Sequence, residues 1–127
     1  MAGLLRSIRR IAVVGLSSKP SRPSNGVAAY LQSHGYEIVP INPNETETLG
    51  IKAFGALDDI PGRIDLVNIF RRAEYAPGVV VEAIKIGARA VWMQERVVSE
   101  EAFEIGRKAG LIMVMDLCML KAHGQLL

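Results

Sequence analysis

The sequence lacks several features that would place the chain outside the class of ordinary soluble domains. It has a single cysteine, Cys118, which excludes an internal disulfide and any metal site built from several cysteines. No apolar run approaches the roughly 18 residues that a membrane-spanning helix needs. The basic, amphipathic start at residues 1–10 also lacks the apolar core and the cleavage site of a signal peptide. We therefore expect a cytoplasmic protein that does not associate with membranes.

A strong excess of charge of one sign is missing as well. The formal net charge is +2, and 22% of the residues are charged while 50% are hydrophobic. A dedicated nucleic-acid-binding domain would be more basic, so we expect no nucleic-acid partner. An anionic ligand would have to be met by a local group of cations. A length of 127 residues fits one domain with a sizeable core, and we treat residues 1–127 as that domain.

Five short apolar runs are present, and they predict five strands. They are continuous rather than alternating, which is typical of strands buried on both faces of a parallel sheet. The runs cover residues 10–15, 36–41, 64–70, 88–93 and 111–115. They recur about every 25 residues with helical segments between them, as in right-handed βαβ units. The predicted fold class is α/β, a Rossmann-like doubly wound open parallel sheet with helices on both faces.

Recognisable end signals mark the predicted helices. Ser24 is the predicted cap of a helix that stops at Gly35, and Ser99 is the predicted cap of one that ends at Gly110. Pro77 stands where the first turn of a third helix tolerates it.

The stretch from residue 42 to residue 63 carries weaker signals. It offers a short extended piece around Ile51 and one helical turn near Leu57. We interpret it as a long connection between two strands rather than as a second domain.

Polar residues follow each predicted strand directly. Ligands of doubly wound sheets bind outside the carboxyl ends of the strands, so these positions are candidates for a site. For Gln94 and Asp116, a purely structural role at the end of a strand is as good an explanation as ligand binding. Two adjacent guanidinium groups at Arg71 and Arg72 repel each other, and folding alone gives no reason for the pair, whereas a bound anion would. The exit residues are Leu16, Ser17 and Ser18, Asn42 and Pro43, Arg71 and Arg72, Gln94 and Glu95, and Asp116.

The loop from Gly15 to Asn25 joins the first predicted strand to a helix start. Unpaired N–H groups and a partial positive charge at a helix start attract phosphate. Lys19 and Arg22 add positive charge, and the prolines at positions 20 and 23 stiffen the segment that carries them. The loop therefore predicts a phosphate site, although a purely solvated turn is the alternative.

The usual nucleotide motifs are absent from this loop. Gly15 is the one plausible member of a G-x-G-x-x-G fingerprint, and Asn42 and Pro43 stand where an acidic residue would bind a ribose diol. A Walker sequence is also missing, which argues against ATP hydrolysis. The cations favour an adenosine diphosphate ligand with an extra phosphate. Coenzyme A (CoA) and NADP both meet that description.

Five longer strings resemble one known family. They are VVGLSSKPSRPSNGVAAYL, GYEIVPINPNE, IDLVNIFRRAE, ARAVWMQERVVSEEA and AGLIMVMDLCMLKAHGQL, which together run from about Ile11 to Leu126. In this order they look like the stand-alone CoA-binding proteins, which are related to the amino-terminal domain of the succinyl-CoA synthetase alpha subunit. The phosphohistidine of the larger synthetases lies in a following domain, so that catalysis is not implied here. The sequence departs from the family pattern at Leu117 and Ala122, where an Arg and an acid are expected, which leaves the role of this segment open.

The resemblance implies a set of CoA-binding residues. The first loop would hold the phosphates, the residues after the second strand would flank the ligand, and the exit of the third strand would contact the adenosine and diphosphate. Gln94 would lie near the pantetheine. The implied residues are Gly15, Leu16, Ser17, Lys19, Arg22, Pro23, Ser24, Asn25, Asn42, Pro43, Ile69, Phe70, Arg71, Arg72 and Gln94.

Cys118, His123 and Asp116 contain the residue types of a thiol-nucleophile site. Packing is the simpler explanation for Cys118, because free cysteines are among the most buried residues. A third reading is a mixed disulfide between Cys118 and the thiol of CoA. His34 is interpreted as a group that satisfies the last carbonyls of a helix. The sequence contains no cluster of metal ligands.

Three functions remain open from the sequence. The preferred hypothesis is a module that binds CoA or an acyl-CoA without catalysis of its own. The second is an enzyme, either an NADP-linked reductase or a Cys-dependent acyl transferase, and the third is a scaffold that has lost its ligand. The helix face at residues 79–87 could form a homodimer or meet a partner enzyme subunit, but the same pattern also suits a helix that covers the sheet.

Overall fold

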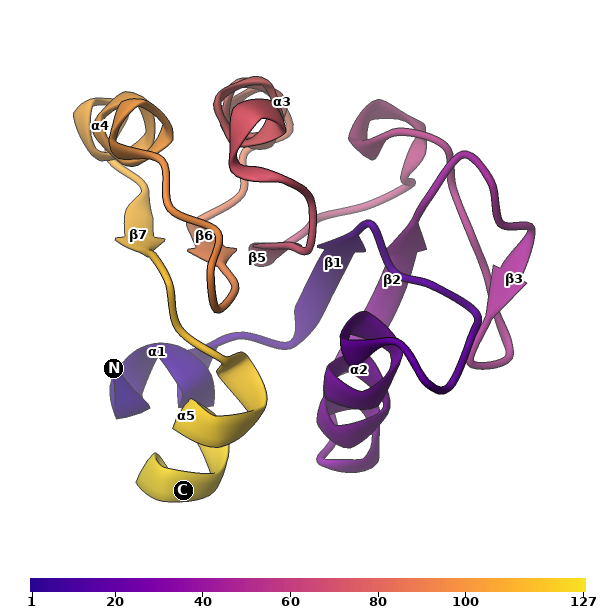
Figure 1. Ribbon diagram of the computed structural model, residues 1–127. Coiled ribbons are helices and arrows are strands. Elements are labelled where there is room, and N and C mark those ends of the chain that lie inside the picture. The colour runs from indigo at the N-terminus through magenta and orange to yellow at the C-terminus, as the bar shows by residue number, and fades with distance from the viewer.

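The computed structural model describes residues 1–127 and contains one five-stranded parallel sheet, as predicted (Figure 1). All residues of β5 and β6 are buried, which explains why these strands are continuous apolar runs in the sequence. In spatial order the strands are β2 (Glu37–Ile41), β1 (Arg10–Val14), β5 (Leu66–Ile69), β6 (Ala90–Met93) and β7 (Ile112–Val114).

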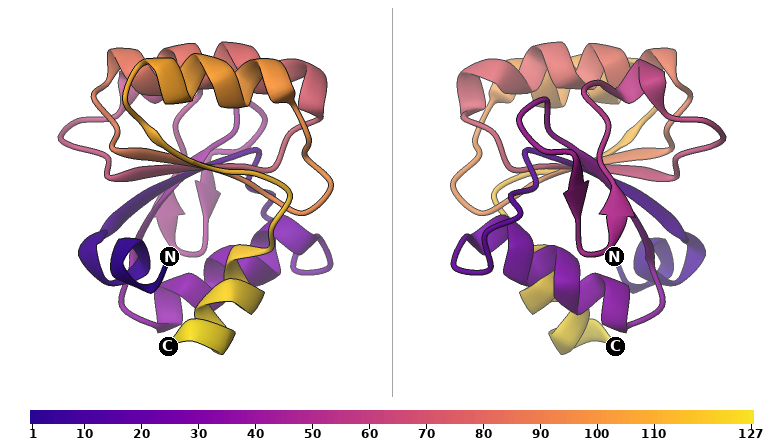
Figure 2. Two further views of the ribbon diagram at one scale, coloured as in Figure 1. Left: turned by 90° about the vertical axis from the view of Figure 1, so that its left-hand side faces the viewer. Right: turned by 90° about the vertical axis from the view of Figure 1, so that its right-hand side faces the viewer.

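Helices cover both faces of this sheet, which confirms the doubly wound architecture (Figures 1 and 2). One face carries α3 (Ala76–Lys85) and α4 (Glu100–Lys108), and the other carries α1 (Ala2–Ser7), α2 (Pro23–Ser33) and α5 (Met119–Leu126). Two hydrophobic clusters form as a result, one on each face of the sheet. None of the helices combines the length and the apolar character that crossing a membrane requires.

The helix α3 covers the sheet with the apolar residues that also suggested a dimer face. Val79, Val80 and Ala83 are buried against the sheet, while Val81 is exposed. The apolar pattern of residues 79–87 is therefore accounted for mainly by packing within the chain.

The predicted ends of two helices are confirmed, and one predicted cap is wrong. The Ser99 hydroxyl accepts a hydrogen bond from the N–H of Ala102 at 3.1 Å, and Pro77 lies in the first turn of α3. Helix α2, however, starts at Pro23 with Arg22 as its N-cap. A proline at the first helical position already has the φ angle that a helix needs, so the helix begins one residue before Ser24. The Ser24 hydroxyl instead accepts the N–H of Ser17 at 3.0 Å.

The connection between β2 and β5 folds back onto the sheet. It contains the two-stranded hairpin of β3 (Glu47–Thr48) and β4 (Ile51–Lys52), followed by the short helix η1 (Leu57–Asp59), which confirms both predicted pieces. Phe54 forms a parallel bridge with Ile41, and the N–H of Asn42 donates to the Phe54 carbonyl at 2.8 Å. This pairing brings the residues after Phe54 to the carboxyl end of the sheet.

Candidate functional site

The glycine that ends β1 allows two strand ends to approach closely. Gly15 has a φ of +90°, a conformation that other residues rarely adopt. A Cβ placed there would lie 2.9 Å from the carbonyl oxygen of Phe70 and 3.2 Å from Cγ of Arg71. The main chain after β1 therefore passes directly against the main chain after β5.

The loop after Gly15 is held in place by its own polar groups. The N–H of Ser17 donates to the Ser24 hydroxyl, and the N–H of Lys19 donates to the Ser17 hydroxyl at 3.1 Å. The side-chain amide of Asn25 donates to the Ser17 carbonyl at 3.0 Å. These bonds fix the loop on the first turn of α2, so its cationic side chains start from a defined main chain.

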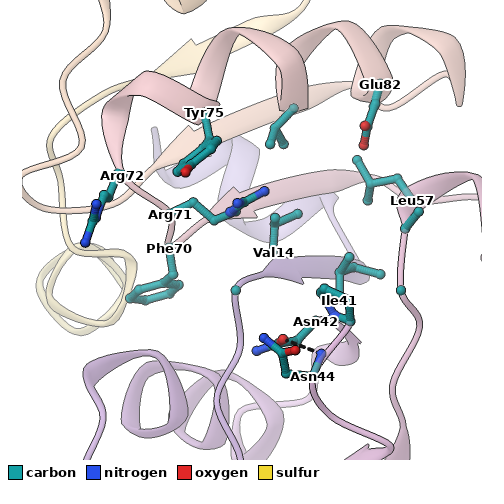
Figure 3. A pocket seen from close by; sticks show the side chains of 15 residues that line it. Val14, Ile41, Asn42, Asn44, Leu57, Phe70, Arg71, Arg72, Tyr75 and Glu82 are labelled. Atoms are coloured by element: carbon teal, nitrogen blue, oxygen red, sulfur yellow. Dashed lines mark hydrogen bonds between the residues drawn. The ribbon is translucent and has the colours of Figure 1, made fainter.

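Three cavities meet around this loop, and Phe70 lines all of them. The first has a volume of about 440 Å³ and an apolar base with polar residues at its rim (Figure 3). The connection after β2 contributes to this cavity, and so does helix α3. Its apolar residues include Val14, Ile41, Leu57 and Val79, and its polar residues include Asn42, Asn44, Arg71, Arg72, Tyr75 and Glu82.

The second cavity, of about 490 Å³, lies between the first loop and the start of α2. Lys19 and Arg22 line it together with two serines, and Glu45 enters it from the turn after β2. Apart from Gly15, Pro23 and Phe70, all the lining residues are polar or charged. This section of the site is therefore suited to an anion.

The third cavity, of about 330 Å³, lies beyond Phe70 at the ends of β6 and β7. Gln94, Val97 and Cys118 line it, and Val27 of α2 closes its other side. The three cavities adjoin one another: Gly15 lines the first and second, Pro23 lines the second and third, and Phe70 lines all three. They form one groove along the carboxyl ends of the strands, which is where doubly wound sheets bind ligands.

Most of the residues implied by the resemblance line this groove. The exceptions are Leu16, Asn25 and Ile69. Leu16 and Ile69 are fully buried, and Asn25 is occupied in holding the loop. The implied residues that do line it are Gly15, Ser17, Lys19, Arg22, Pro23, Ser24, Asn42, Pro43, Phe70, Arg71, Arg72 and Gln94.

The two adjacent arginines do not face one common point. The Arg71 guanidinium lies over the ring of Tyr75, 4.1 Å from its centroid, and Arg72 lies 3.9 Å from the Glu74 carboxylate. Figure 3 shows Arg71 reaching across the first cavity while Arg72 points to one side. Mutual repulsion is relieved by this divergence, so the pair does not require an anion between the two groups.

Two residues at strand exits have structural contacts. The side-chain oxygen of Gln94 accepts the N–H of Met119 at 3.0 Å and the Asn68 amide at 3.3 Å. It thereby holds the start of α5. The Asp116 carboxylate accepts the N–H of Arg96 at 2.6 Å and fixes the turn after β6.

Cys118 and His123 do not form a nucleophile–base pair. Cys118 is 9% exposed and lines the third cavity, whereas His123 lines a separate cavity with residues of α1. The His123 Nδ1 lies 2.9 Å from the Tyr30 hydroxyl, and its ring packs edge-on against His34. Helix packing therefore accounts for His123. His34 closes α2 as predicted, because its Nδ1 lies 2.8 Å from the Tyr30 carbonyl oxygen.

His123 should make the protein less stable in mild acid. Burial lowers the pKa of His123 from its usual 6.5, and the nearby His34 lowers it further. The stability linked to this group is fully present above pH 6.5 and is lost as the pH falls through the lower folded-state pKa. We expect the free energy of unfolding to fall more steeply between about pH 7 and pH 5 in the wild type than in His123→Phe. Urea denaturation at several pH values measures both slopes.

A second variant separates titration from the lost hydrogen bond. Tyr30→Phe removes the partner of His123 but retains both imidazoles, so it should keep the steep pH dependence. Equal slopes in His123→Phe and the wild type would contradict the assignment.

Comparisons with known proteins identify the family of this chain. Residues 9–124 match the family described as CoA binding domain. The uncharacterised Bacillus subtilis protein YneT is 46% identical, with 94% of this chain and 89% of YneT covered. A hypothetical protein from Pyrococcus horikoshii has a solved structure that is 40% identical, with a TM-score of 0.95 over 98% of this chain and 87% of that one.

A larger relative is the ADP-forming acetate–CoA ligase II of Archaeoglobus fulgidus. It is 28% identical over 91% of this chain, which corresponds to 17% of the ligase. The predicted resemblance to a CoA-binding family that also occurs in larger synthetases is confirmed. With nearly its whole length matched, the chain belongs to the CoA-binding domain family.

Proposed function

We propose that this protein binds CoA or an acyl-CoA in the groove formed by the three cavities. The observation that carries the proposal is the order of surfaces along the groove. A cavity with an apolar base and a polar rim adjoins a cationic loop at a helix start, and a third, less polar cavity adjoins the same loop. CoA has the matching order of parts: an adenosine, a highly charged diphosphate, and an uncharged pantetheine arm.

Each part of the ligand has a candidate location. The adenine would lie against Val14 and Ile41 in the first cavity, because a flat apolar ring gains most from burial there. The diphosphate would meet Lys19 and Arg22 at the start of α2, where the helix dipole adds to their charge. The pantetheine would pass Phe70 into the third cavity.

A catalytic role has little support from the side chains of the groove. Cys118 lines the third cavity, but its candidate base, His123, is bound to Tyr30 elsewhere. We therefore propose binding without catalysis by this chain.

Calorimetric titration with CoA, NADP and ATP tests the proposal. We expect CoA to bind and the other two to bind more weakly or not at all. Asn42 stands where an acidic residue would bind a ribose diol, which argues against ATP. The adenosine ribose of NADP carries a phosphate in place of that diol, so the titration itself separates NADP from CoA. Binding of NADP but not CoA would favour the reductase alternative, and no binding would favour the scaffold.

Two arginine variants should locate the phosphates. Arg22 lies beside the helix start, so Arg22→Ala should weaken CoA and dephospho-CoA by the same factor, about fivefold. Arg71 reaches into the adenosine cavity, so Arg71→Ala should weaken CoA by about fivefold and dephospho-CoA much less. Calorimetry with both ligands measures these ratios.

Arg6→Ala is the matched control for the arginine variants. Arg6 is an exposed cation on α1 that lines a different cavity, so its loss should leave both affinities unchanged. Equal losses on both ligands for Arg71→Ala would place Arg71 on the diphosphate instead.

A further inference from the structure

We propose that Glu45 is a specificity-determining residue of the second cavity, where its carboxylate takes an anion position and competes with a phosphoryl group of the ligand. The inference rests on the proposed CoA-binding function and assigns to that site a residue that opposes binding. Its basis is the contact between Glu45 and the first loop, in which Glu45 Oε2 accepts the N–H of Ser18 at 2.7 Å.

The three successive amides of the loop have different kinds of partner. The N–H groups of Ser17 and Lys19 both donate to serine hydroxyls within the loop and α2. The N–H of Ser18 lies between them and donates to a carboxylate from another segment. Ser18 is thus the loop amide that is directed at an anion, and Glu45 supplies that anion.

The position of Glu45 is fixed by its own turn. The N–H of Glu45 donates to the Asn42 carbonyl at 3.1 Å, and the N–H of Asn44 donates to the Asn42 side-chain oxygen at 3.0 Å. The Asn42 amide in turn donates to the Leu16 carbonyl. Asn42 therefore joins the turn that carries Glu45 to the loop that carries Ser18, which keeps the carboxylate close to this amide.

The negative charge of Glu45 offsets the attraction of the surrounding cations for a phosphoryl group. Lys19 and Arg22 line the same cavity, and a phosphoryl group between them would lie near the carboxylate. The hydrogen bond from Ser18 lowers the pKa of Glu45, and the charge of Lys19 lowers it further, so the side chain is ionised at neutral pH. A ligand must displace this carboxylate or tolerate its repulsion, and a neutral ligand part would not be affected.

Glu45→Gln tests this competition directly. We expect the variant to bind CoA and inorganic pyrophosphate about two- to fivefold more tightly than the wild type, since an exposed charge contact of this kind is weak. Pantetheine carries no phosphate and should bind equally to both proteins. Calorimetry measures CoA and pantetheine, and the amide resonance of Ser18 in two-dimensional NMR follows the pyrophosphate titration.

Glu47→Gln is the matched control. It removes the same charge two residues away, from an exposed position on β3 that lines none of the three cavities. We expect unchanged affinities for this variant. Equal tightening in both variants would show a general charge effect and would overturn the proposal.

The remaining outcomes are also decisive. Weaker binding by Glu45→Gln would mean that Glu45 organises the loop for the ligand, and unchanged binding would mean that it does not compete. A Ser18 resonance that does not respond to pyrophosphate in either protein would contradict an anion position at this amide. If wild-type protein fails to bind CoA, the proposed function fails, while the pyrophosphate comparison still decides the role of Glu45.

Discussion

Gly15→Ala is expected to destabilise the fold by about 3 kcal/mol and to weaken CoA binding at least tenfold. The left-handed conformation of Gly15 contributes about 1–2 kcal/mol of this loss once a Cβ is present. The contact with the Phe70 carbonyl at 2.9 Å contributes the rest, because the Phe70 main chain is hydrogen-bonded to Val14 and cannot move aside cheaply. Urea denaturation followed by circular dichroism measures the first effect and calorimetry the second.

The binding loss follows from where the strain is relieved. Gly15 lines the first and second cavities, and Phe70 lines all three. Separating these two segments by even a few tenths of an ångström changes the shape of the groove between the first and second cavities. Ligand affinity should therefore fall even under conditions where the variant remains folded.

Gly35→Ala is the control for the conformational contribution. Gly35 follows α2 with a φ of +94°, and a Cβ there would meet no atom within 4 Å. It should lose only the conformational part, about 1–2 kcal/mol, and bind CoA normally. Equal destabilisation of the two alanine variants would show that the approach of Gly15 to Phe70 is not restrictive.

The second large effect is expected at Asp65, just before β5. Its Oδ2 accepts the N–H groups of Arg9 and Arg10 at 2.9 and 3.0 Å, so one carboxylate joins the starts of β1 and β5. Asp65→Ala leaves both donors without this partner and should lower the free energy of unfolding by about 2–3 kcal/mol at neutral pH. Asp65→Asn retains an acceptor oxygen and should lose about 1 kcal/mol.

The acid dependence gives an independent measure of the same contact. Burial raises the pKa of Asp65, but the hydrogen bonds from Arg10 and Arg9 and the charge of Arg63 lower it more, to a net value below 3.8. The ionised carboxylate thus contributes stability above pH 3.8, and this contribution is lost as the pH falls through the lower folded-state pKa. Both Asp65 variants should lose less stability than the wild type on acidification through this range.

Asp58→Ala is the control for the carboxylate. Asp58 is an exposed residue of η1 whose carboxylate accepts no hydrogen bond, so its removal should change the free energy of unfolding by less than about 0.5 kcal/mol. If the Asp65→Ala variant were as stable as Asp58→Ala, the proposal that Asp65 joins the starts of β1 and β5 would be wrong.

Local patterns predicted the sheet and the loop because the relevant forces act over short stretches of chain. The runs that became β5 and β6 are apolar throughout since both faces are covered. The loop after β1 could be recognised from Gly15, two prolines and two cations, since a helix start needs only neighbouring residues. The same locality explains Ser99, whose capping bond spans three residues.

Residues that reach the groove through distant contacts could not be predicted in this way. Leu57 lines the first cavity because Phe54 pairs with Ile41 across the connection, and no local pattern encodes that bridge. Gln94 lines the third cavity, but its contact with Met119, 25 residues away, which holds the start of α5, has no local signal in the sequence. Glu45 appeared in the sequence as one acid in a polar turn, and its contact with Ser18 depends on how two loops pack.

The Phe54 bridge also bears on how the protein avoids self-association. Strand β2 is the outer strand of the sheet, and an uncovered outer strand offers N–H and carbonyl groups to other molecules. Pro40 removes one of these donors, while its carbonyl accepts the Phe54 N–H at 2.9 Å and the Asn42 N–H donates back. The connection that completes the first cavity thus also covers the β2 edge, so loosening it should promote self-association at this edge as well as change the cavity.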